Sequence, residues 1–449
     1  MLDATRTHVN GIEELKALNG PPIRRVAISE DLCSVPEEIL EHAPTVEILD
    51  LSRNALDSLP EWLPQLRSLK VLFLSGNRFR EVPSVIGRCH SLRMLGMRGC
   101  QIEQIPEDAL PSSLVWLTLT DNHLRSLPRN IGSAHRLRKL LLAGNHLAEL
   151  PDSFRALRSL ELLRLSANQF EELPAWLFEL PELAWLAVAG NPCTTTSSAT
   201  DMSAHAPIPW SELTIGEELG RGASGSTYRA THSPPNEPAR EVAVKVFQST
   251  VSSDGDTGDE IAAAVRAGHH PHLTSTIAPF VEHPEHRAGL VLELVPRTFV
   301  NLAAPPSFES CTRDVYAESC VFTFSTALGY ASYIACAAAH LHQCGIVHGD
   351  LYAHNTLVDG ASALLSDFGA ACFSHSLDPL NRASLERIEV RAMGILVEEL
   401  IARVSESDRT AHADRIARIE NLVNCCLDSA VSARPSFDTV GALLAAESR

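Results

Sequence analysis

A unit of 23 residues recurs along the first half of the chain and constrains its fold more than any other feature. Residues 46–54 read Val-Glu-Ile-Leu-Asp-Leu-Ser-Arg-Asn. The same pattern of apolar residues, closed by Asn or once by Cys, starts again at Leu69, Leu92, Leu114, Leu137, Leu160 and Leu183. The spacing is 23 residues except for one unit of 22, from Leu92 to Ser113. A unit this short cannot bury a core alone, so stacked copies must share one core.

The residue types within a unit indicate how the copies stack. Apolar residues at its fourth and sixth positions, such as Leu49 and Leu51, are expected to point inward from a short strand. The asparagine can satisfy backbone groups where the chain turns. A proline pair follows in each complete unit and suits an extended return without ladder hydrogen bonds. These pairs are Leu59-Pro60, Val82-Pro83, Ile105-Pro106, Leu127-Pro128, Leu150-Pro151 and Leu173-Pro174.

This pattern resembles the leucine-rich repeat family in its 23-residue intracellular form, over residues 23–193. A divergent first copy starts at Ile23 and carries Asp31 in place of asparagine. The resemblance implies an α/β solenoid. Residues 1–22, with Ile12, Leu15 and Leu18 on one face, are predicted to form a helix that caps the exposed apolar end of the array.

The third position of each unit is expected to point outward on the concave face. Apolar side chains dominate this column, and they are Ile48, Val71, Met94, Trp116, Leu162 and Trp185. An outward apolar column with two tryptophans favours a protein partner on this face. The alternative is that these side chains only pack against one another across neighbouring strands.

A second domain is expected over residues 210–449, after a small, polar linker at 194–209. It opens with Gly220, Gly222 and Gly225 in a Gly-x-Gly-x-x-Gly pattern. Such glycines let backbone amides approach phosphates. A dinucleotide-binding turn would need a helix to follow, whereas residues 241–246 read as a plain strand, which excludes that alternative.

Two further motifs give this half its strongest signal. Residues 348–355 read His-Gly-Asp-Leu-Tyr-Ala-His-Asn, and residues 366–369 read Ser-Asp-Phe-Gly. With the glycine-rich loop and the Val-Ala-Val-Lys strand, they resemble the protein kinase family from about residue 213 onward. The resemblance implies an α+β fold of two lobes that uses ATP and Mg²⁺. Asp350 would take the substrate proton, and Asn355 and Asp367 would hold the metal.

The same resemblance assigns the nucleotide contacts. Lys245 would hold the α- and β-phosphates and pair with Glu260 of the following helix. Residues 290–295 resemble the strand and hinge at the adenine edge. The other residues expected to contact the nucleotide are Gly220, Gly222, Gly225, Thr227, Ala243, Glu293, Val295 and Leu357.

The sequence departs from the kinase pattern at three places. Gly349 stands where many kinases have arginine. Tyr352 and His354 stand where serine/threonine and tyrosine kinases carry a lysine and an arginine, respectively. The activation segment, from Asp367 to Glu389, is short and lacks an Ala-Pro-Glu motif, and 384–386 is a poor substitute. The arginine that normally pairs with that glutamate is nevertheless present, as Arg434. These departures predict an altered peptide-docking surface.

Composition limits the partners and the compartment. Acidic residues outnumber basic ones by 55 to 37, so the net charge of −18 disfavours nucleic acid as a partner. No apolar run is long enough to span a membrane. The 11 cysteines are scattered without a Cys-x-x-Cys pair, which is typical of free thiols in a cytoplasmic protein.

The leading hypothesis is therefore a protein kinase, acting on serine or threonine, whose repeats recruit a protein partner. A pseudokinase scaffold that binds nucleotide or partners without efficient phosphotransfer is the alternative. A third hypothesis makes the repeats the functional part and the kinase half a passenger.

Overall fold

The computed structural model describes residues 8–17, 23–194, 206–222, 224–248, 255, 257–360 and 362–447. Its contacts divide the chain into two compact units. The first comprises Met1–Leu163 and Asn168–Pro174. The second comprises Arg164–Ala167 and Ala175–Arg449, so a short piece of the repeat region belongs to the same unit as the C-terminal half.

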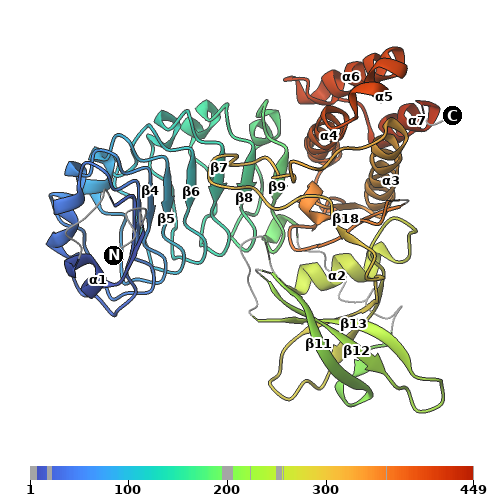
Figure 1. The fold of residues 1–449 in the computed structure, drawn as a ribbon, viewed down its shortest axis with the longest axis horizontal. Helices are drawn as coiled ribbons and strands as arrows, with labels where there is room; N and C mark the ends of the chain where they lie inside the picture. The colour runs from blue at the N-terminus through green and yellow to red at the C-terminus, as the bar shows by residue number, and fades with distance from the viewer. Residues whose placement is uncertain are drawn as a thin grey trace, which may run out of the picture. The chain divides into compact units, whose positions relative to one another are not determined.

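Short parallel strands, one per repeat, lie side by side in the first unit (Figure 1). They are β1 (His8–Asn10), β2 (Arg25–Ala27), β3 (Ile48–Asp50), β4 (Val71–Phe73), β5 (Met94–Gly96), β6 (Trp116–Thr118), β7 (Lys139–Leu141) and β8 (Leu162–Arg164), whose last residue belongs to the second unit. The register aligns the fourth position of successive repeats, so Leu49 lies opposite Leu72 and Leu72 opposite Leu95. These leucines are fully buried, which confirms the predicted shared core.

Short 3₁₀ helices follow the prolines on the return path of most repeats. In the first unit these are η1 (Glu37–His42), η2 (Leu63–Gln65), η3 (Ser84–Arg88), η4 (Ile131–Ser133) and η5 (Asp152–Ala156). Pro36, Pro83 and Pro151 stand just before η1, η3 and η5 in extended backbone conformation. Proline needs no hydrogen-bond donor there, which explains the repeated apolar-proline pair.

The repeat asparagines form a buried ladder of hydrogen bonds. In Asn122, Nδ2 donates to the carbonyls of Met97 and Leu119, both at 2.9 Å. Its Oδ1 accepts from the amides of Cys100 and Ile102 at 3.0 and 2.9 Å. Each asparagine thus closes its own turn and ties it to the preceding repeat. The predicted role of the asparagine in satisfying turn backbone is confirmed.

The N-terminal segment differs from the expected helix over residues 1–22. His8–Asn10 forms β1, and helix α1 spans only Ile12–Ala17. The helix prediction is wrong for β1 because Val9 pairs in parallel with Val26 and becomes fully buried, which extends the sheet by one strand. Residues 1–7 and 18–22, including Leu18, lie outside the described residues.

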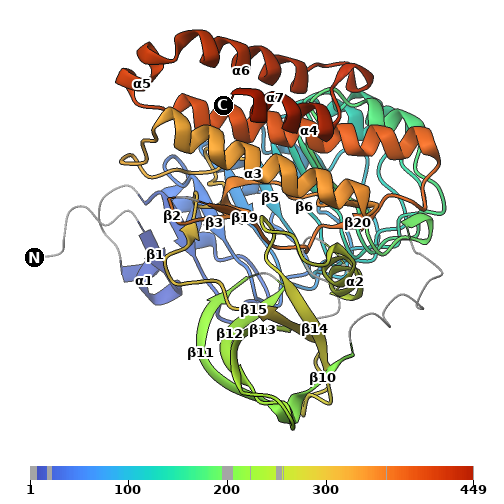
Figure 2. The ribbon, with the colours of Figure 1, turned by 90° about the vertical axis from the view of Figure 1, so that its right-hand side faces the viewer.

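After the repeats, the second unit continues with a sheet. Its strands lie in the order β10-β14-β15-β13-β12-β11. The strands are β10 (Ile208–Pro209), β11 (Leu213–Arg221), β12 (Gly225–His232), β13 (Arg240–Phe247), β14 (Thr276–Val281) and β15 (Gly289–Glu293). Helix α2 (Thr257–Ala267) lies between this sheet and the helices of the other lobe (Figure 2). Of the predicted linker, residues 195–205 lie outside the described part of the chain.

Helices dominate the other lobe of this unit (Figure 2). They are α3 (Phe324–Gln343), α4 (Pro379–Ala402), α5 (Glu406–Ala411), α6 (Ala413–Cys426) and α7 (Phe437–Glu447). Its short strands are β16 (Val300–Asn301), β17 (Ile346–Val347), β18 (Thr356–Val358), β19 (Ala363–Leu365) and β20 (Cys372–Phe373). The end of the repeat region, residues 175–194 and called the last repeat below, contributes η6 (Ala175–Glu179), β9 (Trp185–Ala187) and η7 (Pro192–Thr194) to the unit. Among the described residues, no helix is both long and apolar enough to cross a bilayer.

Asn145 offers a test of the asparagine ladder. Its Nδ2 donates to the carbonyls of Leu119 and Leu142 at 2.9 Å, and its Oδ1 accepts from the Leu124 amide at 3.0 Å. Asn145→Ala leaves the buried Leu124 amide unpaired. The Leu119 and Leu142 carbonyls lose one donor each but keep the side-chain amides of Asn122 and Asn168. The free energy of local opening should therefore fall by about 1–3 kcal/mol. Amide hydrogen exchange of the peptide around Leu124 should accelerate accordingly.

The control is Glu149→Ala, at an exposed position of the same repeat. Unchanged protection in Asn145→Ala, or equal acceleration in both variants, would contradict the ladder as a source of stability.

Candidate active site

A buried glutamate anchors the segment His348–Asn355, the catalytic-loop segment. Glu389 lies in α4 and is 2 % exposed. Its Oε1 accepts from the Gly349 amide at 2.7 Å, and its Oε2 accepts from Nε2 of His342 in α3 at 2.8 Å. The loop backbone is thereby fixed to two helices of the lobe. This anchor explains how a short loop between β17 and β18 keeps one conformation.

Asp350 and Asn355 are held together at the two ends of this loop. Nδ2 of Asn355 donates to Oδ2 of Asp350 at 2.8 Å and to the Asp350 carbonyl at 3.0 Å. The Asn355 carbonyl accepts from the amide and hydroxyl of Ser366 at 2.9 and 2.8 Å. Ser366 directly precedes Asp367, so one chain of hydrogen bonds connects both motifs.

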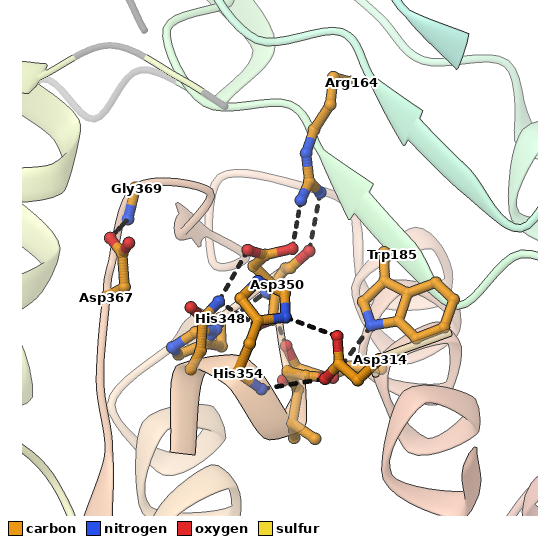
Figure 3. A network of polar contacts seen from close by, with 12 residues as sticks. Arg164, Trp185, Asp314, His348, Asp350, His354, Asp367 and Gly369 are labelled. Atoms are coloured by element: carbon orange, nitrogen blue, oxygen red, sulfur yellow. Dashed lines mark hydrogen bonds and ion pairs between the residues drawn. The ribbon is translucent and has the colours of Figure 1, made fainter. Parts of the chain in front are cut away.

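The other oxygen of Asp350 faces an arginine from the repeat region (Figure 3). Nη2 of Arg164 makes an ion pair with Oδ1 of Asp350, and Nη1 donates to the Gly349 carbonyl at 2.9 Å. Burial raises the pKa of Asp350, but the charges of Arg164, His354 and His348 together outweigh burial, and the pKa is lowered. The carboxylate therefore stays ionised at neutral pH.

Lys245 joins the two lobes of the unit. Its Nζ makes ion pairs with Glu260 of α2 and, at 3.3 Å, with Oδ1 of Asp367. Burial lowers the pKa of Lys245, but Asp367 and Glu260 outweigh burial and raise it. The lysine charge in turn is the main cause that lowers the pKa of Asp367. Lys245 and Asp367 are therefore both charged at neutral pH.

The turn at Asp367 has a strained backbone that aims its side chain. Asp367 has a φ of 65°, in the left-handed region, and its Oδ1 accepts from the Gly369 amide at 3.1 Å. Phe368 is buried, and its ring lies 5.6 Å from that of His348. His348 donates through Nε2 to the Ser366 carbonyl at 3.1 Å. Non-glycine residues with positive φ concentrate at functional sites.

The three glycines of the glycine-rich loop have different surroundings: one is tightly packed and two face open space. A Cβ on Gly225 would lie 2.2 Å from the Val246 carbonyl oxygen, so only glycine lets β12 lie against β13 at this point. A Cβ on Gly220 or Gly222 would meet nothing within 4 Å. The space beside these two positions is open in the absence of ligand, as a backbone that approaches phosphates requires.

The remaining predicted nucleotide contacts come from neighbouring strands. Thr227 lies opposite Lys245 in the β12–β13 register, and Ala243 lies opposite Leu292 in the β13–β15 register. Glu293 ends β15, with Val295 two residues further on. Leu357 lies in β18 of the other lobe.

The donor atoms of Asp367 and Asn355 suit a hard divalent cation. Asp367 is 49 % exposed, so its carboxylate is accessible, and Asn355 adds an amide oxygen. Mg²⁺ prefers oxygen ligands and is usually held by one or two carboxylates together with substrate phosphates. In the described part of the chain, this site included, no three His, Cys, Asp or Glu side chains gather into a group that could hold a metal ion.

The segment after Asp367 leads directly into α4, which begins at Pro379. Within this helix Glu386 pairs with Arg382 at 3.0 Å rather than with Arg434. Arg434 instead donates to the carbonyls of Pro181 and Leu183, at 2.7 and 3.4 Å. The last repeat therefore receives the hydrogen bonds of the arginine that the kinase resemblance pairs with a glutamate.

Trp185 packs on the catalytic-loop segment. Its ring stacks on Tyr352 with centroids 4.1 Å apart and planes 6° apart, and its Nε1 donates to the Leu351 carbonyl at 3.0 Å. The prediction of a partner contact is wrong for Trp185, which is 1 % exposed, and for Leu162, which is also buried. Val71 and Met94 are buried too, whereas Ile48 and Trp116 are partly exposed.

Comparison with known proteins agrees with both resemblances. Residues 213–387 match the family model of the protein kinase domain, and residues 29–79, 44–102 and 135–192 match that of the leucine rich repeat. The chain thus carries leucine-rich repeats followed by a protein kinase domain, an α/β solenoid and a two-lobed α+β fold.

Relatives match at low identity. The tyrosine-protein kinase receptor TYRO3 of Danio rerio is 26 % identical over 182 residues, 40 % of this chain and 21 % of that protein. A probable LIM domain-containing serine/threonine-protein kinase of Dictyostelium discoideum is 24 % identical over 266 residues, 51 % of this chain and 26 % of that protein. The serine/threonine-protein kinase mos of Xenopus laevis is 26 % identical over 165 residues, 36 % of this chain and 43 % of that protein. The chain spans less than half the length of each of these relatives.

Sequence reasoning missed Arg164 and misassigned Trp185. Arg164 occupies the fifth position of its repeat, where other copies carry Asp50, Phe73, Gly96, Thr118, Leu141 and Ala187. One basic residue in so variable a column gives no local signal. The available signal was the catalytic-loop segment itself, in which no lysine or arginine stands near Asp350.

Glu389→Ala tests the anchor of the catalytic-loop segment. The change leaves the Gly349 amide and the His342 ring without their buried partner, which should cost about 2–6 kcal/mol. The unfolding midpoint of the second unit should fall by about 5 °C or more in calorimetry of the full chain. Glu398→Ala, at an exposed position of α4, serves as the control. Equal midpoints for the two variants would refute the anchoring role.

Proposed function

We propose that this chain is a protein kinase that transfers the γ-phosphate of ATP to a serine or threonine hydroxyl. One observation carries the proposal. Lys245 of the sheet lobe pairs with both Glu260 and Asp367, while Asp350 and Asn355 are hydrogen-bonded to each other in the catalytic-loop segment. Four separate motifs thus meet as charged, oriented groups, which a purely structural domain does not need.

The arrangement supports an in-line transfer of the phosphoryl group. The substrate hydroxyl would approach Asp350, which accepts its proton as the oxygen–phosphorus bond forms. The bond between the γ-phosphorus and the bridging oxygen breaks, and ADP leaves with that electron pair. Lys245, kept cationic by its partners, would hold the α- and β-phosphates. Asp367 and Asn355 would hold Mg²⁺, whose charge would help to neutralise the phosphates.

The nucleotide would lie between the sheet lobe and β18. Gly220 and Gly222 leave room for the phosphates beside the loop backbone. Thr227 and Ala243 would lie on one side of the adenine and Leu357 on the other, with Glu293 and Val295 at its edge. Gly225 serves the packing of the loop.

Serine or threonine is the proposed acceptor. The matches to the two Dictyostelium serine/threonine kinases extend over 266 and 280 residues, against 182 for the tyrosine kinase receptor. Phosphoamino-acid analysis of the labelled product tests this part, and phosphotyrosine as the main product would contradict it.

The repeats are proposed to recruit a protein partner through Ile48 and Trp116. Both lie in the outward column and are partly exposed. Nζ of Lys139 lies 4.0 Å from the Trp116 ring centroid, which places an apolar surface beside a charge. Interfaces commonly combine these features. We also propose a cytoplasmic location, supported by 11 free cysteines.

A nucleotide-binding scaffold is the second candidate function. Two features favour it. Asp350 is already ion-paired with Arg164, and the loop has Tyr352 and no lysine or arginine of its own. Such a scaffold would bind MgATP but transfer no phosphate.

Asp350→Asn distinguishes these functions. Because asparagine cannot accept the hydroxyl proton, phosphate incorporation from γ-labelled ATP should fall roughly 10²–10⁴-fold. MgATP binding by calorimetry should change by less than about twofold, since Asp350 lies on the acceptor side of the transferred phosphate. The Mg²⁺ requirement is checked by repeating the assay with a chelator.

Asp414→Asn makes the same change at an exposed aspartate of the second unit and should leave the rate unchanged. MgATP binding without incorporation by the wild-type chain would favour the scaffold. Equal incorporation by wild type and Asp350→Asn would show that Asp350 is not the base.

A further inference from the structure

The catalytic-loop segment lacks a basic partner of its own for Asp350. Between Gly349 and Asn355 the residues are Asp, Leu, Tyr, Ala and His. His354 is turned to Asp314, with Nδ1 donating to Oδ1 at 2.7 Å and its amide donating to Oδ2 at 2.9 Å. The loop histidine therefore binds another carboxylate, and a basic partner for Asp350 must come from outside the loop.

Arg164, from the repeat region, provides the basic partner that the loop itself lacks (Figure 3). Its two terminal nitrogens divide between the Asp350 carboxylate and the Gly349 carbonyl. With Asn355 on the other oxygen, each oxygen of Asp350 receives one donor. Two donors on different oxygens fix the plane of a carboxylate. A carboxylate offers about four acceptor sites, so capacity remains for a substrate hydroxyl.

Gly349 shows that the loop is shaped for this contact. Its φ is 73°, and a Cβ would lie 2.6 Å from the Ala370 carbonyl oxygen and 3.0 Å from that of Leu186. Leu186 lies in β9 of the last repeat. The arginine that many kinases carry at this position could not fit. Glycine admits the repeat backbone, and Arg164 brings a guanidinium to the adjoining carbonyl.

The segment that carries these contacts is secured by further bonds within the second unit. Arg164–Ala167 is tied to the last repeat, since the amides of Leu165 and Ala167 donate to the carbonyls of Ala187 and Ala189 at 2.8 and 2.7 Å. The last repeat is held in turn by Arg434, by the Arg391–Glu182 ion pair and by Trp185 on Tyr352.

The geometry favours support of the catalytic base over obstruction. The Arg164 side chain is 1 % exposed, so it is shielded from the nucleotide side, whereas the Asp350 side chain remains 17 % exposed. The contact also coexists with the Lys245–Glu260 and Lys245–Asp367 pairs. Access to Asp350 and an assembled lysine site are both present while Arg164 is in place.

We infer that Arg164 is a positioning residue for phosphotransfer, supplied to the catalytic loop from the repeat region, which orients Asp350 without contacting the substrate. The inference rests on the proposed kinase function. It makes the last part of the repeat region a component of the active site.

The experiment compares full-length Arg164→Met, Arg164→Lys and Arg158→Ala chains with wild type, with casein and the chain itself as acceptors. Methionine keeps the apolar stem but removes the charge and both donors. The kcat of Arg164→Met should fall about 100-fold, as expected for a misplaced catalytic group, with KM for ATP and MgATP binding within twofold of wild type. Lysine restores the charge but only one directed contact, so its rate should be intermediate. Arg158 is exposed and its variant should match wild type.

Three results would overturn the inference. An Arg164→Met rate equal to wild type would make the ion pair irrelevant to catalysis. A higher rate would make it an inhibitory contact. Loss of MgATP binding together with the rate would reduce Arg164 to a folding role.

Hydrogen exchange of residues 348–352 separates this inference from the proposed function. Should the wild-type chain transfer no phosphate, the kinase proposal fails, and exchange still tests the positioning. Faster exchange in Arg164→Met than in Arg158→Ala would support it. Equal exchange would reject it.

Discussion

The second unit depends on one constraint, that the charged groups around a buried loop must all be paired. Asp350 is satisfied by Asn355 from its own loop and by Arg164 from the repeat region. Glu389 secures the backbone next to it through the Gly349 amide. Removing one partner of a buried ion pair typically costs about 3–5 kcal/mol, because the other charge is left in a poor solvent. The shape of the loop and the placement of the last repeat are thus two aspects of one requirement.

Local patterns allowed most of the fold to be predicted. The repeat could be recognised because its leucines and asparagines recur at a fixed spacing. In successive copies the leucines are buried in the core and the asparagines are buried at the turns. The kinase motifs could be read because phosphate chemistry demands particular residues at short separations. Asp350 and Asn355 are only five residues apart, and the kinase resemblance pairs Lys245 with Glu260, 15 residues further on. The assignment of their roles remains a proposal.

Long-range packing accounts for what the sequence did not reveal. Arg164 and Asp350 are 186 residues apart, and nothing near Arg164 distinguishes it from the other outward residues of the repeats. Trp185 has the outward position expected of a partner-binding residue, yet its partner is Tyr352 of the same chain. His8–Asn10 lacks repeat residues of its own and becomes a strand because the edge of β2 is open to pairing. In each case a distant surface, rather than local propensity, decides the outcome.

The residues that match the kinase family model are not the same as those that form the compact physical unit. The kinase match covers residues 213–387, whereas residues that hold the catalytic-loop segment lie at Arg164 and Trp185 before it and at Glu389 after it. The short activation segment and Gly349 are defects if the kinase half is judged alone. Gly349 becomes consistent once the last repeat is included, because a larger residue there would meet the carbonyls of Ala370 and of Leu186 in β9. Departures from a motif can therefore mark the place where another part of the chain enters a site.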